Sequence, residues 1–176
     1  YVDNSCLTAG NGTTQICGAT GPFLSIRAAA ENGSLAAGDT IKIRATGTPY
    51  VEILTTTGVA GTAGNPILAT RYDGDTSKPV WTRTTTDELL DITQPYWTFD
   101  NIDFDGGGVG SDIIDALASN LTLRNCKIHN GTNDGISINQ NGDNLTVDNC
   151  ELYDLGSGGN THAIVTAKES GDNSND

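Results

Sequence analysis

Apolar and polar residues alternate in short runs that recur through the second half of the chain. Three ten-residue segments align at a spacing of 24: residues 96–105 (YWTFDNIDFD), 120–129 (NLTLRNCKIH) and 144–153 (NLTVDNCELY). In each copy, two apolar residues two positions apart, such as Leu121 and Leu123, precede an asparagine and then a second apolar pair. A period of two is typical of a β-strand with one buried face, so each copy predicts two short strands joined at a bend.

A third strand is predicted between the copies. In residues 130–144 (NGTNDGISINQNGDN), Ile136 and Ile138 alternate around Ser137, with Gly, Asn and Asp on both sides. So small a repeat cannot bury its own apolar face, whereas parallel stacking at about 4.8 Å buries a continuous core. The run from Leu121 to Ile128 also matches a leucine-rich repeat, but residues 130–144 carry helix breakers where that fold needs a helix. The pattern predicts an all-β solenoid with three strands per rung, a parallel β-helix.

The predicted stack of Asn101, Asn125 and Asn149 at one bend resembles the right-handed parallel β-helix family of secreted carbohydrate-active and surface proteins. Residues 38–52 (GDTIKIRATGTPYVE) resemble that family's opening rung, and residues 65–75 (NPILATRYDGD) resemble the next one. The similarity covers about three quarters of the chain. It implies a right-handed helix, a secreted or cell-surface location and a role in polysaccharide recognition or lyase-like processing.

The two ends of the stack differ in what covers them. Residues 22–32 (PFLSIRAAAEN) predict a short amphipathic helix that starts at Pro22, ends before Gly33 and caps the first rung. We therefore expect an N-terminal loop and cap helix over residues 1–37 and β-helix rungs over residues 38–176. Residues 167–176 are polar where another rung is due, so we expect that the native chain continues or that a partner, including a second copy, covers this end.

Composition and charge narrow the partners. The chain has 22 Gly, no Met and 36% hydrophobic residues, which favours a turn-rich β protein over a helical bundle. With 9 Lys and Arg against 22 Asp and Glu, the net charge of -13 argues against nucleic acid or an anionic membrane surface as a partner. No apolar run is long enough to insert into a bilayer.

The four cysteines fall into two pairs. Cys126 and Cys150 occupy equivalent inward positions 24 residues apart, so they either stack as thiols or join as a disulfide between rungs. Cys6 and Cys17 lie in a Gly- and Thr-rich loop with little core of its own, where we expect a disulfide. Neither a C-x-x-C pair nor a nearby pair of histidines favours metal binding by these cysteines.

Stacking turns each outward position into a column of side chains. Two columns alternate in charge, Asp100 with Arg124 and Asp148, and Asp103 with Lys127 and Glu151; a third holds Thr98, Thr122 and Thr146. A charged face of this kind is a candidate polysaccharide site, for which we select Asp100, Arg124, Asp148 and His129. The structural alternative is a ladder of surface ion pairs worth under ~1 kcal/mol each.

No complete catalytic set is visible in the sequence. An eliminating lyase needs a base and a cation such as Ca²⁺ beside a substrate carboxylate. Lys127, Lys168 and His162 are the candidate acid–base groups, although His162 lies opposite Asp134, where a hydrogen bond would stabilise the bend. Ca²⁺ is the one cofactor that the sequence suggests, through Asp103, Asp105 and Asp112 in a glycine-rich loop without EF-hand spacing.

Two functions from different classes remain. The family resemblance implies recognition or processing of a polysaccharide or cell-surface glycan. The alternative is a non-catalytic structural or adhesive module, such as a filament or fibre subunit that self-associates through its C-terminal rung.

Overall fold

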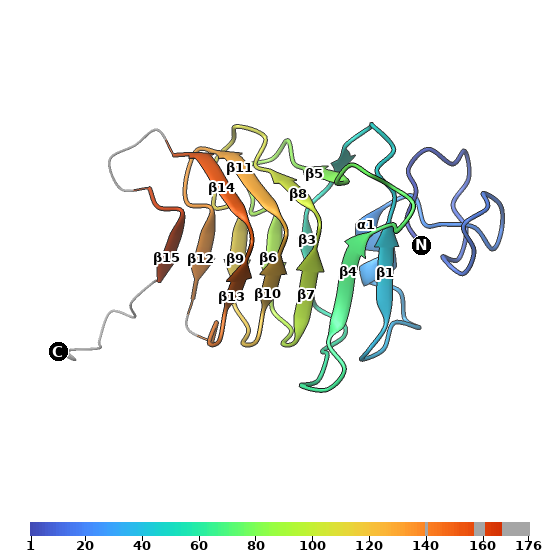
Figure 1. The fold of residues 1–176 in the computed structure, drawn as a ribbon, viewed down its shortest axis with the longest axis horizontal. Helices are drawn as coiled ribbons and strands as arrows, with labels where there is room; N and C mark the ends of the chain where they lie inside the picture. Colours follow the sequence, from blue (N-terminus) through green and yellow to red (C-terminus); the bar gives the residue numbers. More distant parts are fainter. Residues whose placement is uncertain (140, 157–160, 167–176) are drawn as a thin grey trace, which may run out of the picture.

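The computed structural model describes residues 1–139, 141–156 and 161–166, which form a stack of parallel strands (Figure 1). Three sheets of five strands each surround one core. The first sheet contains β1 (Thr40–Ile43), β4 (Ile67–Arg71), β7 (Trp97–Asp100), β10 (Thr122–Arg124) and β13 (Thr146–Asp148). The second contains β2 (Tyr50–Val51), β5 (Val80–Thr82), β8 (Asp103–Asp105), β11 (Lys127–Gly131) and β14 (Glu151–Leu155). The third contains β3 (Leu54–Thr55), β6 (Leu90–Ile92), β9 (Ile114–Ala116), β12 (Ile136–Ile138) and β15 (Ile164–Thr166).

Each rung contributes one strand to every sheet, so the first rung is β1–β2–β3 and the fifth is β13–β14–β15. Thr122 pairs with Thr98 on one side and with Thr146 on the other, and all the strand pairs are parallel. This register has the predicted spacing of 24. The predicted parallel β-helix is confirmed.

The interior is built from the predicted inward positions and from aromatic residues of the second and third rungs. Trp97 and Phe99 stack with ring centroids 5.8 Å apart, and Phe104 lies 6.0 Å from Phe99 and 5.7 Å from Trp81. These four side chains are at most 1% exposed. Since rings of this size each bury a large apolar area, they form the densest part of the core.

The bends between strands use residues in the left-handed backbone region. Three columns have positive φ at non-glycine residues: Tyr96, Asn120 and Asn144; Asn101, Asn125 and Asn149; and Asn130 with Asp154. Asparagine tolerates this conformation better than most residues, which explains its recurrence at these places. The sequence predicted a structural role for the second column alone.

One buried cation organises the bends of the second and third rungs. The guanidinium of Arg83, which is 2% exposed, donates to the backbone carbonyls of Gly106, Val109, Ser111 and Asp112 at 2.6 to 3.1 Å, and also to that of Asp87. A buried guanidinium needs every N–H satisfied. Arg83 therefore fixes the bend that follows β5 and the bend that follows β8.

The predicted cap helix is present but shorter than expected. Helix α1 spans Ile26–Ala30, and its N-cap is Ser25, whose side chain accepts a hydrogen bond from the Ala28 backbone N–H at 3.0 Å. The prediction that Pro22 starts the helix is wrong, because Ser25 in an extended conformation caps it three residues later. The Glu52 carboxylate also accepts from the N–H groups of Ile26 at 2.7 Å and Arg27 at 3.0 Å, which ties the helix to the first rung.

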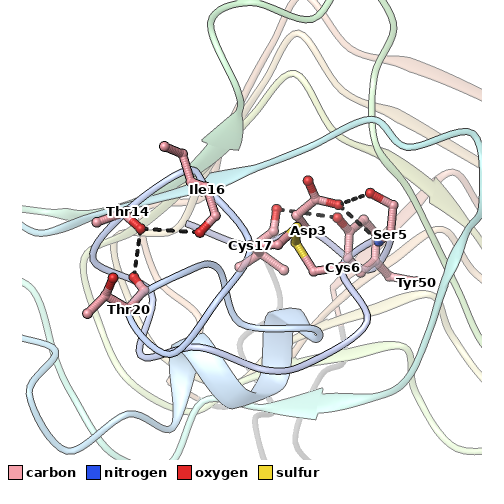
Figure 2. Close-up of a disulfide and its surroundings, with 9 residues drawn as sticks. Asp3, Ser5, Cys6, Thr14, Ile16, Cys17, Thr20 and Tyr50 are labelled. Carbon is pink, nitrogen blue, oxygen red and sulfur yellow. Dashed lines mark hydrogen bonds between the residues drawn. A yellow bond between two sulfur atoms is a disulfide. The ribbon is translucent and has the colours of Figure 1, made fainter.

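The N-terminal loop covers the edge of the first rung. Val2 donates to the Lys42 carbonyl at 2.8 Å and accepts from the Arg44 N–H at 2.9 Å, so the edge of β1 is paired there. The predicted disulfide between Cys6 and Cys17 is confirmed and closes this loop (Figure 2).

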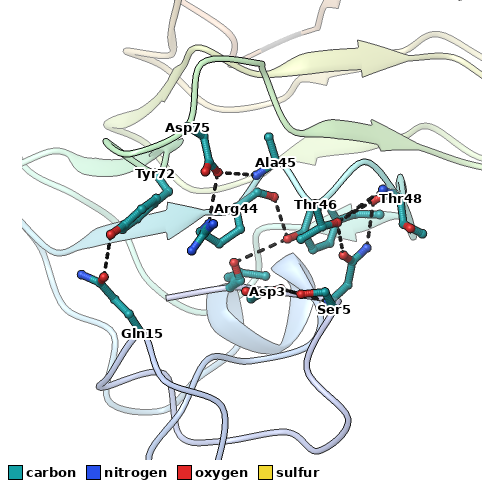
Figure 3. A network of polar contacts seen from close by, with 12 residues as sticks. Asp3, Ser5, Gln15, Arg44, Ala45, Thr46, Thr48, Tyr72 and Asp75 are labelled. Carbon is teal, nitrogen blue, oxygen red and sulfur yellow. Dashed lines mark hydrogen bonds and ion pairs between the residues drawn. The ribbon is translucent and has the colours of Figure 1, made fainter.

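Polar contacts tie the loop to the first two rungs (Figure 3). The Tyr72 hydroxyl donates to Gln15 Oε1 at 2.6 Å, and Asp75 Oδ2 accepts from the Ala45 N–H at 2.6 Å and from Arg44 Nε at 3.2 Å. The Arg44 guanidinium lies 4.6 Å from the centre of the Tyr72 ring. These contacts order a segment with little apolar surface of its own.

Two predictions concern the rest of the chain. Among the described residues, no helix is long and apolar enough to cross a membrane. The expectation for the C-terminal segment falls on residues 167–176, which lie outside the described residues.

Candidate functional site

A shallow groove of about 360 Å³ runs along the outer face of the first sheet, over the second to fifth rungs. We call it the threonine groove because Thr98, Thr122 and Thr146, which lie in register on β7, β10 and β13, form its floor. Its other lining residues are Tyr96, Asn120, Asn144, Ala63 and Pro66. Each successive rung thus presents a hydroxyl beside an amide in the same orientation.

The groove edge follows one column of left-handed bends. Asn120 and Asn144 have φ of 62° and 59°, and Asn144 Nδ2 donates to Asn120 Oδ1 at 3.5 Å. Tyr96 occupies the same position in the third rung with φ of 60°. A bulky residue is rare in this region, which costs about 1–2 kcal/mol, and such strain is concentrated at functional positions. Tyr96 was not among the predicted site residues, although its alignment with the two asparagines marks it in the sequence.

The predicted charged column lies beside the groove and is largely occupied by internal contacts. Arg124 Nη2 lies 3.3 Å from Asp100 Oδ2, and Asp100 Oδ1 accepts from Asn101 Nδ2 at 3.0 Å and from Asn125 Nδ2 at 2.8 Å. Asp148 pairs with Arg124 in the strand register and is exposed. Asp100 therefore orients neighbouring side chains, which leaves Asp148 and one face of Arg124 towards solvent.

The predicted asparagine stack exists in a modified form. Asn149 Nδ2 donates to Asn125 Oδ1 at 2.7 Å, and Asn125 in turn donates to Asp100. Asn101 joins through its own bond to the same Asp100 oxygen. The ladder is therefore a mixed asparagine–aspartate network.

Several predicted candidates gather on the outer face of the second sheet. His129 Nε2 lies 2.7 Å from Asp103 Oδ1, and the His129 ring stacks on Tyr153 at 4.8 Å with 3° between the planes. Lys127 Nζ lies 3.7 Å from the Glu151 carboxylate. His129 and Lys127 thus come together on one face, but each already has an acidic partner.

The structure does not assemble the predicted Ca²⁺ ligands. Asp105 Oδ1 accepts from the Gly107 N–H at 2.9 Å and from Asn130 Nδ2 at 2.7 Å, whereas Asp112 Oδ1 accepts from Asn133 Nδ2 at 2.6 Å. Asp103 holds His129 instead. Within residues 1–139, 141–156 and 161–166, no group of three or more His, Cys, Asp or Glu side chains is placed to hold a metal ion.

The two other candidate acid–base residues differ in what the structure shows. The His162 backbone N–H donates to Asp134 Oδ1, and His162 Nδ1 lies 3.3 Å from the same oxygen. This contact fixes the bend one rung below Asp134. Lys168 lies outside the described residues.

A pair of carboxyl groups that the sequence interpretation missed lies on the third sheet. Asp91 and Asp115 are partners in register on β6 and β9, and Asp91 Oδ2 accepts from Thr55 Oγ1 at 3.0 Å. Among the described residues, Asp91 Oδ1 is buried without a hydrogen-bond partner. Burial raises the pKa of Asp115 to about 6 and also raises the pKa of Asp91. The sequence signal is an Asp between apolar residues in both 90–92 and 114–116, again 24 apart.

Cys126 and Cys150 are stacked free thiols, as one of the two sequence alternatives proposed. The Cys126 backbone N–H donates to Cys150 Sγ at 3.3 Å. The other alternative, a disulfide between the rungs, is absent from this structure.

Comparison with known proteins agrees with this architecture. A family model described as a right handed beta helix region matches residues 87–175, just over half of the chain. No curated protein and no solved structure matches the chain. The matched part contains the third to fifth rungs, where the repeat of 24 is regular. On the three parallel sheets and this match, the chain belongs to the right-handed β-helix family.

Proposed function

We propose that this chain is a secreted or cell-surface protein that recognises an extended polysaccharide along the threonine groove. The observation that carries the proposal is the regular lining of the groove by hydroxyls and amides from successive rungs. Hydroxyl and amide groups both donate and accept hydrogen bonds, as do the hydroxyls of a sugar.

The spacing of the groove suits a polymer. Neighbouring rungs are about 4.8 Å apart, so Thr98, Thr122 and Thr146 offer equivalent contacts at regular intervals along the helix axis. Small-molecule sites are usually enclosed, whereas this groove is shallow and continues over several rungs. Tyr96, at the third rung, offers an aromatic surface for the apolar face of one sugar ring.

Charge narrows the ligand further. The net charge of -13 disfavours a polyanion, and Asp148 adds a negative charge beside the groove. An eliminating lyase would need a basic group at the substrate, but Lys127 lies on the second sheet against Glu151. These features favour recognition of a neutral polysaccharide over elimination on an acidic one.

The disulfide supports the proposed location. Stable disulfides are typical of proteins that reside in oxidising compartments, and Cys6–Cys17 closes a loop with little apolar core. A secreted or cell-surface protein would meet polysaccharides there.

The test is a panel of neutral and acidic polysaccharides in affinity electrophoresis and calorimetry, followed by the Thr122→Val variant. Valine keeps the shape of threonine but removes the hydroxyl in the middle of the groove. We expect the dissociation constant to rise about 3- to 10-fold, as for the loss of one hydrogen bond. Thr82→Val, on the second sheet, is the matched control and should bind like the wild type.

Two outcomes would count against the proposal. Equal binding by Thr122→Val and the wild type would place the ligand elsewhere. Fibres that form with rising concentration, without affinity for any polysaccharide, would favour the alternative of a structural or adhesive module; negative-stain imaging and size-exclusion chromatography detect them.

A further inference from the structure

Cys126 and Cys150 lie one above the other at the bend between the first and second sheets. Arg124 pairs with Asp148 just before the two cysteines, and Lys127 pairs with Glu151 just after them. Both flanks are thus in register, so the cysteine backbones keep the spacing of adjacent strands. That spacing is about 4.8 Å, inside the 4.4–6.8 Å range of Cα separations that a disulfide spans.

The two sulfur atoms have different surroundings. Cys126 is 1% exposed, and its thiol lies 3.2 Å from the Arg124 carbonyl and 3.5 Å from the Phe99 carbonyl, both hydrogen-bond acceptors. Cys150 is partly exposed, and its sulfur accepts the Cys126 backbone N–H at 3.3 Å. The inner thiol is therefore enclosed by acceptors, while the outer sulfur faces a donor and solvent.

This asymmetry acts on reactivity. A hydrogen bond from the Cys126 thiol, helped by the Cys126 N–H, stabilises the thiolate and lowers the pKa of Cys150. The same side-chain contact and burial raise the pKa of Cys126. Since the thiolate is the nucleophile, Cys150 reacts first and Cys126 follows once a neighbouring sulfur becomes electrophilic.

We propose that Cys126 and Cys150 form a reversible disulfide that links the fourth and fifth rungs, with Cys150 as the sulfur that first attacks a small-molecule disulfide. The existing disulfide between Cys6 and Cys17 is independent of this pair, at the opposite end of the stack (Figure 1). The inference does not depend on the proposed carbohydrate ligand.

The reaction is a two-step exchange. The Cys150 thiolate attacks one sulfur of an oxidised low-molecular-weight disulfide such as glutathione disulfide; the reagent's sulfur–sulfur bond breaks and one thiolate leaves, taking a proton from water. Cys126 then loses its proton to water and attacks the Cys150 sulfur, which expels the second small thiol. The two protein thiols are oxidised to one disulfide, and the reagent is reduced to two thiols.

The experiment treats the full chain with glutathione disulfide, alkylates the remaining thiols and maps the peptides by mass spectrometry. We expect the wild type to yield a peptide pair linked through Cys126 and Cys150, with both cysteines protected from alkylation. Addition of a thiol reductant at a concentration that spares Cys6–Cys17 should restore both alkylated peptides.

Two serine variants separate the roles of the sulfurs. Cys126→Ser should stop at a stable glutathione adduct on Cys150, whereas Cys150→Ser should leave Cys126 unmodified because that thiol is buried. Quantitative alkylation of both thiols in the treated wild type, or a wild-type adduct on Cys150 that never resolves, would overturn the proposal. The wild-type measurement decides the matter even if a variant folds poorly.

Discussion

The mixed asparagine–aspartate ladder can be tested at its centre, Asn125. This residue has φ of 52°, donates to Asp100 at 2.8 Å and accepts from Asn149 at 2.7 Å. Asn125→Ala removes both hydrogen bonds and places a β-carbon in the left-handed region. The bond to the carboxylate contributes about 1.5 kcal/mol and the more exposed amide–amide bond about 0.5 kcal/mol, while the backbone conformation costs alanine about 1 kcal/mol. We expect a loss of about 3 kcal/mol in the free energy of unfolding.

Asn125→Gly isolates the backbone contribution. Glycine adopts positive φ without the steric cost, so this variant should lose only the two hydrogen bonds, about 2 kcal/mol. Asn149→Gly is the matched control, because Asn149 is exposed and donates only to Asn125; its loss should stay near 0.5 kcal/mol. Urea unfolding followed by the fluorescence of the buried Trp81 and Trp97 measures all three.

Two results would refute this account. If the alanine and glycine variants agree within about 0.3 kcal/mol, the left-handed backbone of Asn125 imposes no cost on alanine. If Asn125→Gly retains the stability of the wild type, the ladder orders side chains without stabilising the fold.

Three further predictions concern buried polar groups. The folded protein binds a proton at Asp115 more tightly than the unfolded chain, since its pKa is raised to about 6, so stability is lost as pH rises from about 4 through 6. Asp115→Asn should remove that slope and, after discounting for solvent screening, gain about 1 kcal/mol at pH 8; parallel pH profiles of urea unfolding would contradict this. Arg83→Met strands the carbonyls that the guanidinium satisfies and should cost more than about 3 kcal/mol in the same assay, so a loss under 1 kcal/mol would show that water replaces it. Glu52→Ala removes the acceptor of the first two N–H groups of α1 and should speed hydrogen exchange at Ile26 and Arg27, whereas Glu52→Gln, which keeps one oxygen, should exchange at an intermediate rate.

The regular part of the fold follows from local sequence because its repeat is uniform. In the third to fifth rungs, the spacing of 24 determines which residues face inward and which pair, as Leu123 does with Phe99 and Val147. The first rungs are harder to recognise by repetition, because Thr40 pairs with Leu68 and Ile67 with Trp97, at offsets of 28 and 30. Their bends are longer, so equivalent residues do not align, and family resemblance was needed to identify these rungs.

The candidate site was less predictable because side chains choose partners by reach. Asp103 is in register with Lys127, yet its carboxylate contacts His129, two residues further along β11. The glycine-rich loop suggested a cation site, but Asp105 and Asp112 are satisfied by local amides. Tyr96 and the Asp91–Asp115 pair lie at repeat-equivalent positions, so a full comparison of the aligned copies would have detected them.

The constant register of the later rungs makes this part of the molecule modular. Thr98, Thr122 and Thr146 are interchangeable in their pairing, and the bends before and after them repeat the same backbone conformation. Excision of one whole unit of 24 residues would bring Thr146 directly beside Thr98 without shifting any other partner. The length of such a chain can therefore change by duplication or loss of entire units, and the groove would lengthen or shorten in equal steps.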